Sequence, residues 1–209
     1  MDRYNETRRV RSQGSKANGE RTLFDSQCDL AALVYEQNED PDEILRTFAA
    51  DLAALGYRAA GPVQRGRHRL DEGLPALLLH SGEELELFRA VGAGPAGPRL
   101  DAARLSDAAA QIERVIVRGA DVLIVNRFGR QELEGKGLCR LVERAAGADI
   151  PVVIAVPAHR FAGWIRFSGG MSVKLRCDRD ALDDWWHKVA LRMPGQPARE
   201  RQTFCGLVK

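Results

Sequence analysis

The residues best suited to chemistry gather in one glycine-rich stretch, Asn126-Arg127-Phe128-Gly129-Arg130-Gln131-Glu132, followed by Glu134-Gly135-Lys136-Gly137. Arginine side chains and the free amides that open a helix both bind tetrahedral anions. The stretch therefore predicts an oxyanion site or a partner-binding site. An alternative stays open, in which this is a solvated turn whose arginines pair with Glu132 and Glu134. The predicted ligand-binding residues here are Asn126, Arg127, Gly129, Arg130, Lys136 and Gly137.

A second candidate stretch runs Pro157-Ala158-His159-Arg160-Phe161 and continues through Trp164 to Ser168-Gly169-Gly170-Met171. His159 has the chemistry of an acid or base, but no Ser or Cys beside it forms a nucleophile elbow. We therefore predict no catalytic residue. Ser168, Gly169 and Gly170 join the predicted ligand-binding set as an anion nest, with a tight turn as the competing interpretation.

The first candidate loop of the sheet, Glu36-Gln37-Asn38-Glu39-Asp40-Pro41, lacks what a phosphate-binding loop needs. Such a loop uses glycines for close backbone approach and a lysine against the negative charge. This loop has neither and carries three carboxylates, and no GxxxxGK[ST] signature occurs anywhere in the chain. The sequence therefore argues against ordinary ATP or GTP hydrolysis.

Metal, membrane and nucleic-acid functions find no support in the composition. The four cysteines (28, 139, 177 and 205) show no CxxC spacing, and His68, His80 and His187 have no ligand-like spacing, so we predict no metal site and reduced thiols. The apolar runs fall short of the roughly 18 residues of a membrane span, and the N-terminus is polar. We expect a cytoplasmic protein with no membrane partner.

The 209 residues suit one α/β domain with a tail at each end. We predict a flexible tail over 1–27, a single domain over 28–192 and a C-terminal tail over 193–209. The whole chain and each tail carry a net charge of +2, which leaves −2 for the domain. The basic character thus lies in the ends, and a plain tail is favoured over a nucleic-acid-binding arm.

Strand and helix patterns alternate along the domain. Short apolar runs, typical of strands buried on both faces, predict a mainly parallel sheet with helices on both faces. Asp40, Pro41 and Glu43 predict a capped helix start, Gly56 its end, and 76–88 an inserted β-hairpin. Ligands in such sheets bind beyond the carboxyl ends of the strands. The predicted strands are 30–35, 58–64, 121–125, 150–156 and 173–176, and the predicted helices 40–56, 101–118, 137–146, 159–167 and 180–191.

The order of these elements resembles that of the small nucleoside-triphosphatases of the P-loop class. That resemblance implies a Walker A loop after the first strand and an Asp-Glu pair after the apolar strand 121–125. Residues 36–41 and Asn126-Arg127 stand at those positions, so both motifs are degenerate.

A closer resemblance is to an uncharacterised bacterial domain family of this shape. It rests on Ala32 to Glu36, Gly61-Pro62-Val63-Gln64, the whole stretch 126–137, and Trp164 to Gly170. Members of that family are often associated with molybdate transport and molybdenum enzymes. The resemblance therefore implies a link to molybdenum metabolism.

Taken together, these features indicate a non-catalytic protein of P-loop-like fold that binds a ligand or a partner. The ligand favoured is a small oxyanion, molybdate or phosphate, and the partner a protein of unknown identity. One alternative is a nucleoside-triphosphate-binding or hydrolysing enzyme with a non-standard phosphate loop, in which Glu36 or Glu132 holds magnesium. Another is a protein-interaction module without a small ligand.

Overall fold

A computed structural model describes residues 29–64, 75–89 and 99–193 of the chain. The predicted tail over 1–27, and the predicted C-terminal tail apart from Met193, lie outside these residues, as do His68, Cys28 and Cys205. Within the described part the element order is strand and helix in alternation, interrupted once by short antiparallel strands.

Five parallel strands form the main sheet in the spatial order β10-β1-β9-β8-β2. The strands β1 and β9 pair along six positions, from Leu30 opposite Val152 to Tyr35 opposite Pro157. The loops that follow β1, β8, β9 and β10 therefore leave the same edge of the sheet. The strand bounds are β1 Leu30–Tyr35, β2 Ala59–Ala60, β8 Val122–Val125, β9 Val152–Pro157 and β10 Val173–Arg176.

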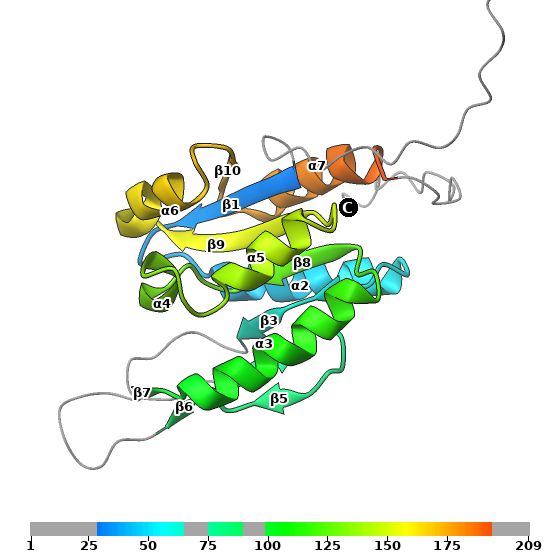
Figure 1. Cartoon of the computed structure of the whole chain (residues 1–209). Coiled ribbons are helices and arrows are strands. Elements are labelled where there is room, and N and C mark those ends of the chain that lie inside the picture. Colours follow the sequence, from blue (N-terminus) through cyan, green and yellow to red (C-terminus); the bar gives the residue numbers. More distant parts are fainter. Residues whose placement is uncertain (1–28, 65–74, 90–98, 194–209) are drawn as a thin grey trace, which may run out of the picture.

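Helices cover both faces of this sheet, as predicted (Figure 1). One face packs against α3 and α5, with Trp164 of α6, and the other against α2 and α7. The helix bounds are α2 Pro41–Ala54, α3 Ala102–Val117, α4 Arg130–Leu133, α5 Cys139–Ala146, the 3-10 turn η1 Ala158–Arg160, α6 Phe161–Phe167 and α7 Arg179–Ala190.

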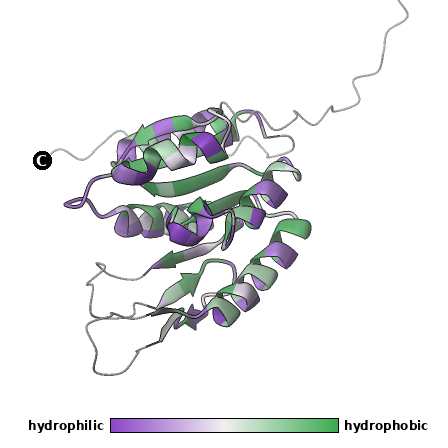
Figure 2. Cartoon of the chain, turned by 60° about the vertical axis from the view of Figure 1, so that its left-hand side comes forward, coloured by the Kyte–Doolittle hydropathy of each residue, from purple (hydrophilic) through white to green (hydrophobic). Residues whose placement is uncertain are grey.

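Alternating strand residues divide the core into two parts. In β1, Leu30 and Ala32 face α3 and α5, whereas Ala31 and Leu33 face α2 and α7. Figure 2 shows hydrophobic residues along the central strands and hydrophilic ones on the outward sides of the helices. Trp185 and Trp186 of α7 are buried in the part of the core that faces α2.

The predicted strand over 58–64 is wrong in one respect, because Gly61 divides it. The backbone of Gly61 has a φ of +127°, and a β-carbon there would lie 1.8 Å from the Ile124 carbonyl oxygen. Only glycine allows this close approach. The chain therefore leaves the main sheet after β2 and enters a second sheet as β3, Pro62–Gln64.

The inserted hairpin is confirmed and proves to be part of two small antiparallel sheets beside α3 (Figure 1). In the first, β4 pairs with both β3 and β5. The chain pattern did not predict the second, formed by β6 and β7. The bounds are β4 Ala76–Leu78, β5 Glu84–Leu85, β6 Phe88–Arg89 and β7 Arg99–Leu100.

Specific residues mark the start and the end of α2, the helix that follows the loop after β1. The Asp40 carboxylate accepts a hydrogen bond of 3.2 Å from the Glu43 amide, and Pro41 occupies the first helical turn, both as predicted. Gly56, with a φ of +84°, follows the last turn. Leu55 is 53% exposed, because the helix has already ended there.

None of the described helices is long and apolar enough to cross a membrane.

Candidate functional site

A cleft of about 560 Å³ opens at the carboxyl-terminal edge of the parallel sheet. Its lining residues come from the ends of β1 and β9 and from the loops after β1, β8 and β9, where ligands bind in open parallel sheets. The lining residues are Tyr35, Glu36, Gln37, Asn38, Arg127, Pro157, His159 and Arg160.

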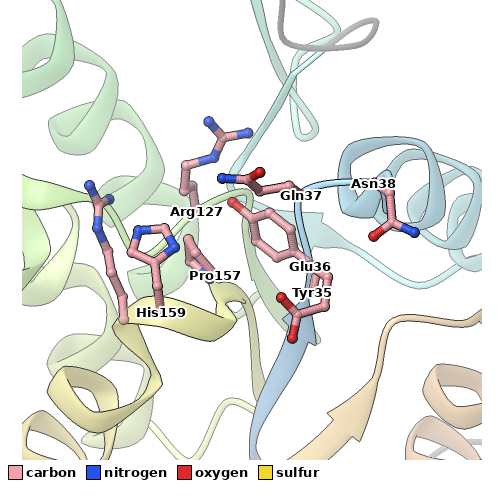
Figure 3. A pocket seen from close by; sticks show the side chains of 8 residues that line it. Tyr35, Glu36, Gln37, Asn38, Arg127, Pro157 and His159 are labelled. Atoms are coloured by element: carbon pink, nitrogen blue, oxygen red, sulfur yellow. The ribbon is translucent and has the colours of Figure 1, made fainter.

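Side chains of different character face one another across this cleft (Figure 3). Arg127 and His159 lie on one side, and Tyr35 and Gln37 point toward them from the end of β1. Glu36 and Asn38, at the start of the turn that follows β1, point the other way. The carboxylate that would repel an anion is thus turned away from the cations.

Arg160 adds a further positive charge to the same side of the cleft. Its Nη1 atom would lie 3.9 Å from a β-carbon at Gly129, which places the guanidinium against the loop after β8. Among the described residues, Arg160 has no ion-pair partner. Its charge is therefore available to a ligand.

Arg127 is held by two groups beneath the cleft. Its Nη2 atom lies 3.4 Å from the Asp42 carboxylate, and its guanidinium carbon lies 6.0 Å from the centre of the Tyr35 ring. Burial raises the pKa of the Tyr35 hydroxyl, and the positive charges of Arg127 and Arg160 oppose that rise. Tyr35 is accordingly a neutral hydrogen-bonding group at neutral pH.

Asp42 is the most unusual carboxylate of this region. Its side chain is 4% exposed, and burial raises its pKa to about 6, although Arg127 acts to lower it. Within the described residues, one Asp42 oxygen, Oδ1, and the Arg127 Nε atom are both buried without a hydrogen-bond partner. The pair is thus incompletely satisfied, a condition that buried polar groups rarely tolerate without a reason.

The amides of the loop after β1 are bound by the loop's own carboxylates. The Glu36 amide donates to the Glu39 carboxylate at 2.7 Å, and the Glu43 amide donates to Asp40 at 3.2 Å. Pro41 has no amide hydrogen to offer. These are the positions at which a phosphate loop would present amides to its ligand.

A carboxylate also binds the amides at the glycine-rich stretch. Glu132, 7% exposed, accepts hydrogen bonds of 2.9 Å from the Gly129 amide and of 2.9 Å from the Leu138 amide. Gly137 leaves room for it, since a β-carbon there would lie 2.2 Å from Glu132 Oε1. The two Glu132 oxygens are therefore engaged with the backbone, on either side of the short helix α4.

The structure separates the residues that the sequence grouped over 126–137. Arg127 lines the cleft, whereas the Arg130 and Lys136 side chains are 83% and 67% exposed and lie 3.1 and 3.5 Å from Glu134. That pairing matches part of the solvated-turn alternative. Asn126, Gly129 and Gly137 are not among the residues that line the cleft.

Ser168, Gly169 and Gly170 form the turn that ends α6. Their amides donate to the carbonyl oxygens of Trp164, Arg166 and Ile165 respectively, at 2.8, 3.4 and 2.9 Å. This is the pattern of a helix C-terminus. The three residues are not among those that line the cleft.

Sequence reasoning left Tyr35, Gln37, Arg160 and Asp42 out of the predicted site. Tyr35 looked like the last residue of a buried strand, and Asp42 like an ordinary acidic residue in a first helical turn. The signal that points to Tyr35, Gln37 and Arg160 is their place at the ends of neighbouring parallel strands. For Asp42 only burial, visible in the structure, distinguishes it from Glu43.

Comparison with known proteins identifies the family to which this chain belongs. The family described as "Protein of unknown function (DUF2478)" matches residues 30–185, from the start of β1 into α7. The chain belongs to this family. The sequence resemblance to an uncharacterised domain family is thereby confirmed, and the match includes every residue that lines the cleft.

One relative of this DUF2478 chain is the molybdenum import ATP-binding protein ModC 2 of Bradyrhizobium diazoefficiens. The two are 36% identical over 167 residues, which is 78% of this chain and 19% of that protein. The chain thus spans about a fifth of the length of the relative it matches.

A solved structure similar to this one is that of THEP1 from the hyperthermophile Aquifex aeolicus. The TM-score is 0.56 at 15% identity, over 79% of this chain and 99% of THEP1. At that identity the likeness concerns the fold. The P-loop-NTPase-like α/β fold expected for this DUF2478 chain is confirmed.

Proposed function

We propose that this protein binds an oxyanion group in the cleft at the carboxyl edge of its sheet and does not hydrolyse nucleoside triphosphates. The observation that carries the proposal is that Arg127, Arg160 and His159 line one side of a cleft that Glu36 also lines, with the Glu36 carboxylate pointing away from Arg127 and His159. Arginine guanidinium groups bind tetrahedral oxyanions through paired hydrogen bonds.

The loop after β1 supports the second half of the proposal. In a phosphate loop the backbone amides must be free for the ligand, but here Glu39 and Asp40 already accept hydrogen bonds from two of them. A triphosphate would have to displace both carboxylates and then lie against them. We regard the loop as a degenerate Walker A segment that no longer binds phosphate.

Molybdate is the first oxyanion to test, because the relative that shares this domain is a molybdenum import protein. Its ATP-binding activity belongs to a much longer polypeptide and gives no direct expectation for this chain. Within the proposal, the protein acts in the cytoplasm as a non-catalytic component of molybdenum metabolism. Phosphate, sulfate and tungstate serve as comparison anions of similar shape.

The competing function is that of a nucleotide-binding enzyme with a non-standard loop, which the fold and the name of the relative favour. In that case Glu36 or Glu132 would hold magnesium. Both Glu132 oxygens already accept backbone amides, so Glu132 would first have to leave them.

A thermal-shift panel tests the two functions against each other. The protein is melted with molybdate, tungstate, sulfate and phosphate, and separately with ATP and GTP in the presence of Mg²⁺. A ligand at 100 times its Kd stabilises the folded state by about 2.7 kcal/mol, which is readily measured. We expect a shift with at least one oxyanion and none with the nucleotides; a shift with nucleotides alone would overturn the proposal.

A pair of arginine variants locates the site. Arg160→Gln removes a cation that has no ion-pair partner within the described part of the chain, and should weaken oxyanion binding by about tenfold or more. Arg130→Gln removes the same charge from a side chain that pairs with Glu134 outside the cleft. Equal losses of affinity in both variants would indicate a diffuse charge effect and would contradict the assignment of the site.

A further inference from the structure

Resting on the proposed function, we infer that the ligand is a phosphate monoester of a flat ring with hydrogen-bonding groups, and that Tyr35, Pro157 and Gln37 bind the ring. The cations on one side of the cleft bind its phosphate. The observations that point to this ligand class are the size of the cleft, the unequal character of its two sides and the surface between them.

The cleft is much larger than an inorganic oxyanion. One water molecule occupies about 30 Å³ of the liquid. A tetrahedral oxyanion has five heavy atoms, so by this comparison its volume is on the order of 100 Å³. The cleft holds about 560 Å³, a volume typical of sites for organic ligands. A bare oxyanion would leave most of it to solvent.

The arginines do not surround the cleft. Arg127 and Arg160, with the His159 imidazole, come from the loops after β8 and β9. The β1 side facing them presents the neutral Tyr35 and Gln37 side chains, while the carboxylate of Glu36, which also lines the cleft, points the other way (Figure 3). A symmetric anion would use only one side. A ligand with one anionic end and one neutral body would use both.

Between the two sides, Tyr35 and Pro157 contribute apolar surface to the cleft. Tyr35 and Pro157 are opposite one another in the register of β1 and β9, so their side chains lie on the same face of the sheet. An aromatic ring beside a proline offers a flat surface on which a planar ring can lie. The amide of Gln37, which points over this surface, can donate to and accept from the edge of such a ring.

The test compares monoesters with and without a ring. Titration calorimetry on the full chain uses guanosine 5′-monophosphate and flavin mononucleotide as ring monoesters, with glycerol 3-phosphate and inorganic phosphate as controls. We expect at least one ring monoester to bind tenfold or more tightly than both controls. Equal affinity of glycerol 3-phosphate and the ring monoesters would overturn the role of the ring.

Two glutamine variants assign the ring to its side of the cleft. Gln37→Ala should weaken the ring monoester at least threefold and leave inorganic phosphate unchanged. Gln111→Ala, the same change in α3 at a residue that does not line the cleft, is the matched control and should change neither affinity. An equal effect of both variants, or a loss of phosphate affinity in Gln37→Ala, would contradict the assignment.

The outcomes separate this inference from the proposed function. Binding of inorganic oxyanions that depends on Arg160, without any preference for ring monoesters, would refute the inference and leave the proposed function standing. Failure of all the anions, inorganic and esterified, would refute both. If ATP with Mg²⁺ bound as tightly as the ring monoesters in separate titrations, the part of the proposed function that excludes triphosphates would be refuted.

Discussion

Glu132 and Asp42 are both buried carboxylates at the carboxyl edge of the sheet, but their surroundings differ. Glu132, in α4, accepts a hydrogen bond on each carboxylate oxygen, one from the Gly129 amide and one from the Leu138 amide at the start of α5. Asp42 lies 3.4 Å from Arg127 through one oxygen, and its other oxygen has no partner among the described residues. Burial raises the pKa of Asp42 to about 6.

The difference distinguishes a structural carboxylate from one next to a binding site. Fully hydrogen-bonded buried groups fix a loop, whereas incompletely bonded ones cost free energy and persist where a ligand or a charge change makes use of them. Glu132 fixes the backbone of the glycine-rich stretch. Asp42 contacts Arg127, one of the arginines that line the cleft.

The largest expected effect is that of removing the structural carboxylate. Glu132→Ala leaves two backbone amides, one of them in the buried segment at Leu138, without their acceptor. We expect a loss of about 3–5 kcal/mol in the free energy of unfolding, measured by urea denaturation.

Glu134→Ala is the matched control for that experiment, because Glu134 lies two residues away and is exposed. Its urea midpoint should stay close to that of the unmodified protein. A similar shift in both variants would mean that charge in this segment, rather than the two amide bonds, stabilises the fold.

The next effect concerns Asp42 and depends on pH. Because its folded pKa of about 6 lies above the ordinary 3.8, the folded state binds more protons than the unfolded state between these values. Its contribution to stability is therefore present below pH 4 and lost as the pH rises through 6. The Asp42→Asn variant has no carboxyl group to titrate, so it does not lose this stability as the pH rises. The unfolding free energy of the variant minus that of the unmodified protein should therefore increase by up to about 3 kcal/mol between pH 4 and pH 7.

Comparing the two proteins at each pH cancels the titration of groups that they share. The charged and titratable groups that face Asp42 are Arg127, Asp40, Tyr35 and Cys177. Burial and several carboxylates raise the Cys177 pKa to about 12, and the Tyr35 pKa is raised as well. Neither titrates in this range. A difference that stays constant from pH 4 to pH 7 would show that Asp42 is not held in a destabilised, charged form.

Much of the fold could be predicted from the sequence, because most of its helices and strands are specified by short local sequence patterns. The apolar runs of β1, β8 and β9, the cap at Asp40 and the stop at Gly56 each act over a few residues. The division at Gly61 was missed because it depends on the Ile124 carbonyl, which is distant in the chain. The short pairs β6 and β7 left no periodic signal.

The candidate site was less predictable, since it depends on which way each side chain points. Arg127, Arg130 and Lys136 are all cations of one short stretch, and the sequence does not distinguish them. Arg127 lines the cleft and the other two do not, because of where β8 ends and α4 begins. Glu132 looked like a surface acid because its partners are backbone amides, which a sequence does not distinguish. Whether the predicted residues beyond Arg127 bind a ligand stays a prediction.

A smaller expected effect tests how Glu132 and Gly137 fit together. Gly137 has a φ of +61° and Gly135 a φ of +72°, but only at Gly137 would a β-carbon meet Glu132. Gly135→Ala should cost about 1 kcal/mol from backbone strain alone, and Gly137→Ala about 2 kcal/mol or more. In a Glu132→Ala background the difference between the two costs should shrink, and the remainder reflects the Gln131 β-carbon, 3.0 Å from a β-carbon at Gly137. An unchanged difference there would contradict the contact with Glu132.

The smallest expected effect separates Lys136 from the cleft. Its side chain is 67% exposed and lies 3.5 Å from Glu134, an exposed pair of the kind that contributes little. Lys136→Ala should change neither the urea midpoint nor the affinity for the oxyanion that Arg160→Gln weakens. Calorimetry on the two variants side by side provides the measurement. A tenfold loss of affinity in Lys136→Ala would instead extend the site to the glycine-rich stretch, and would require that stretch to rearrange when the anion binds, because Lys136 does not line the cleft.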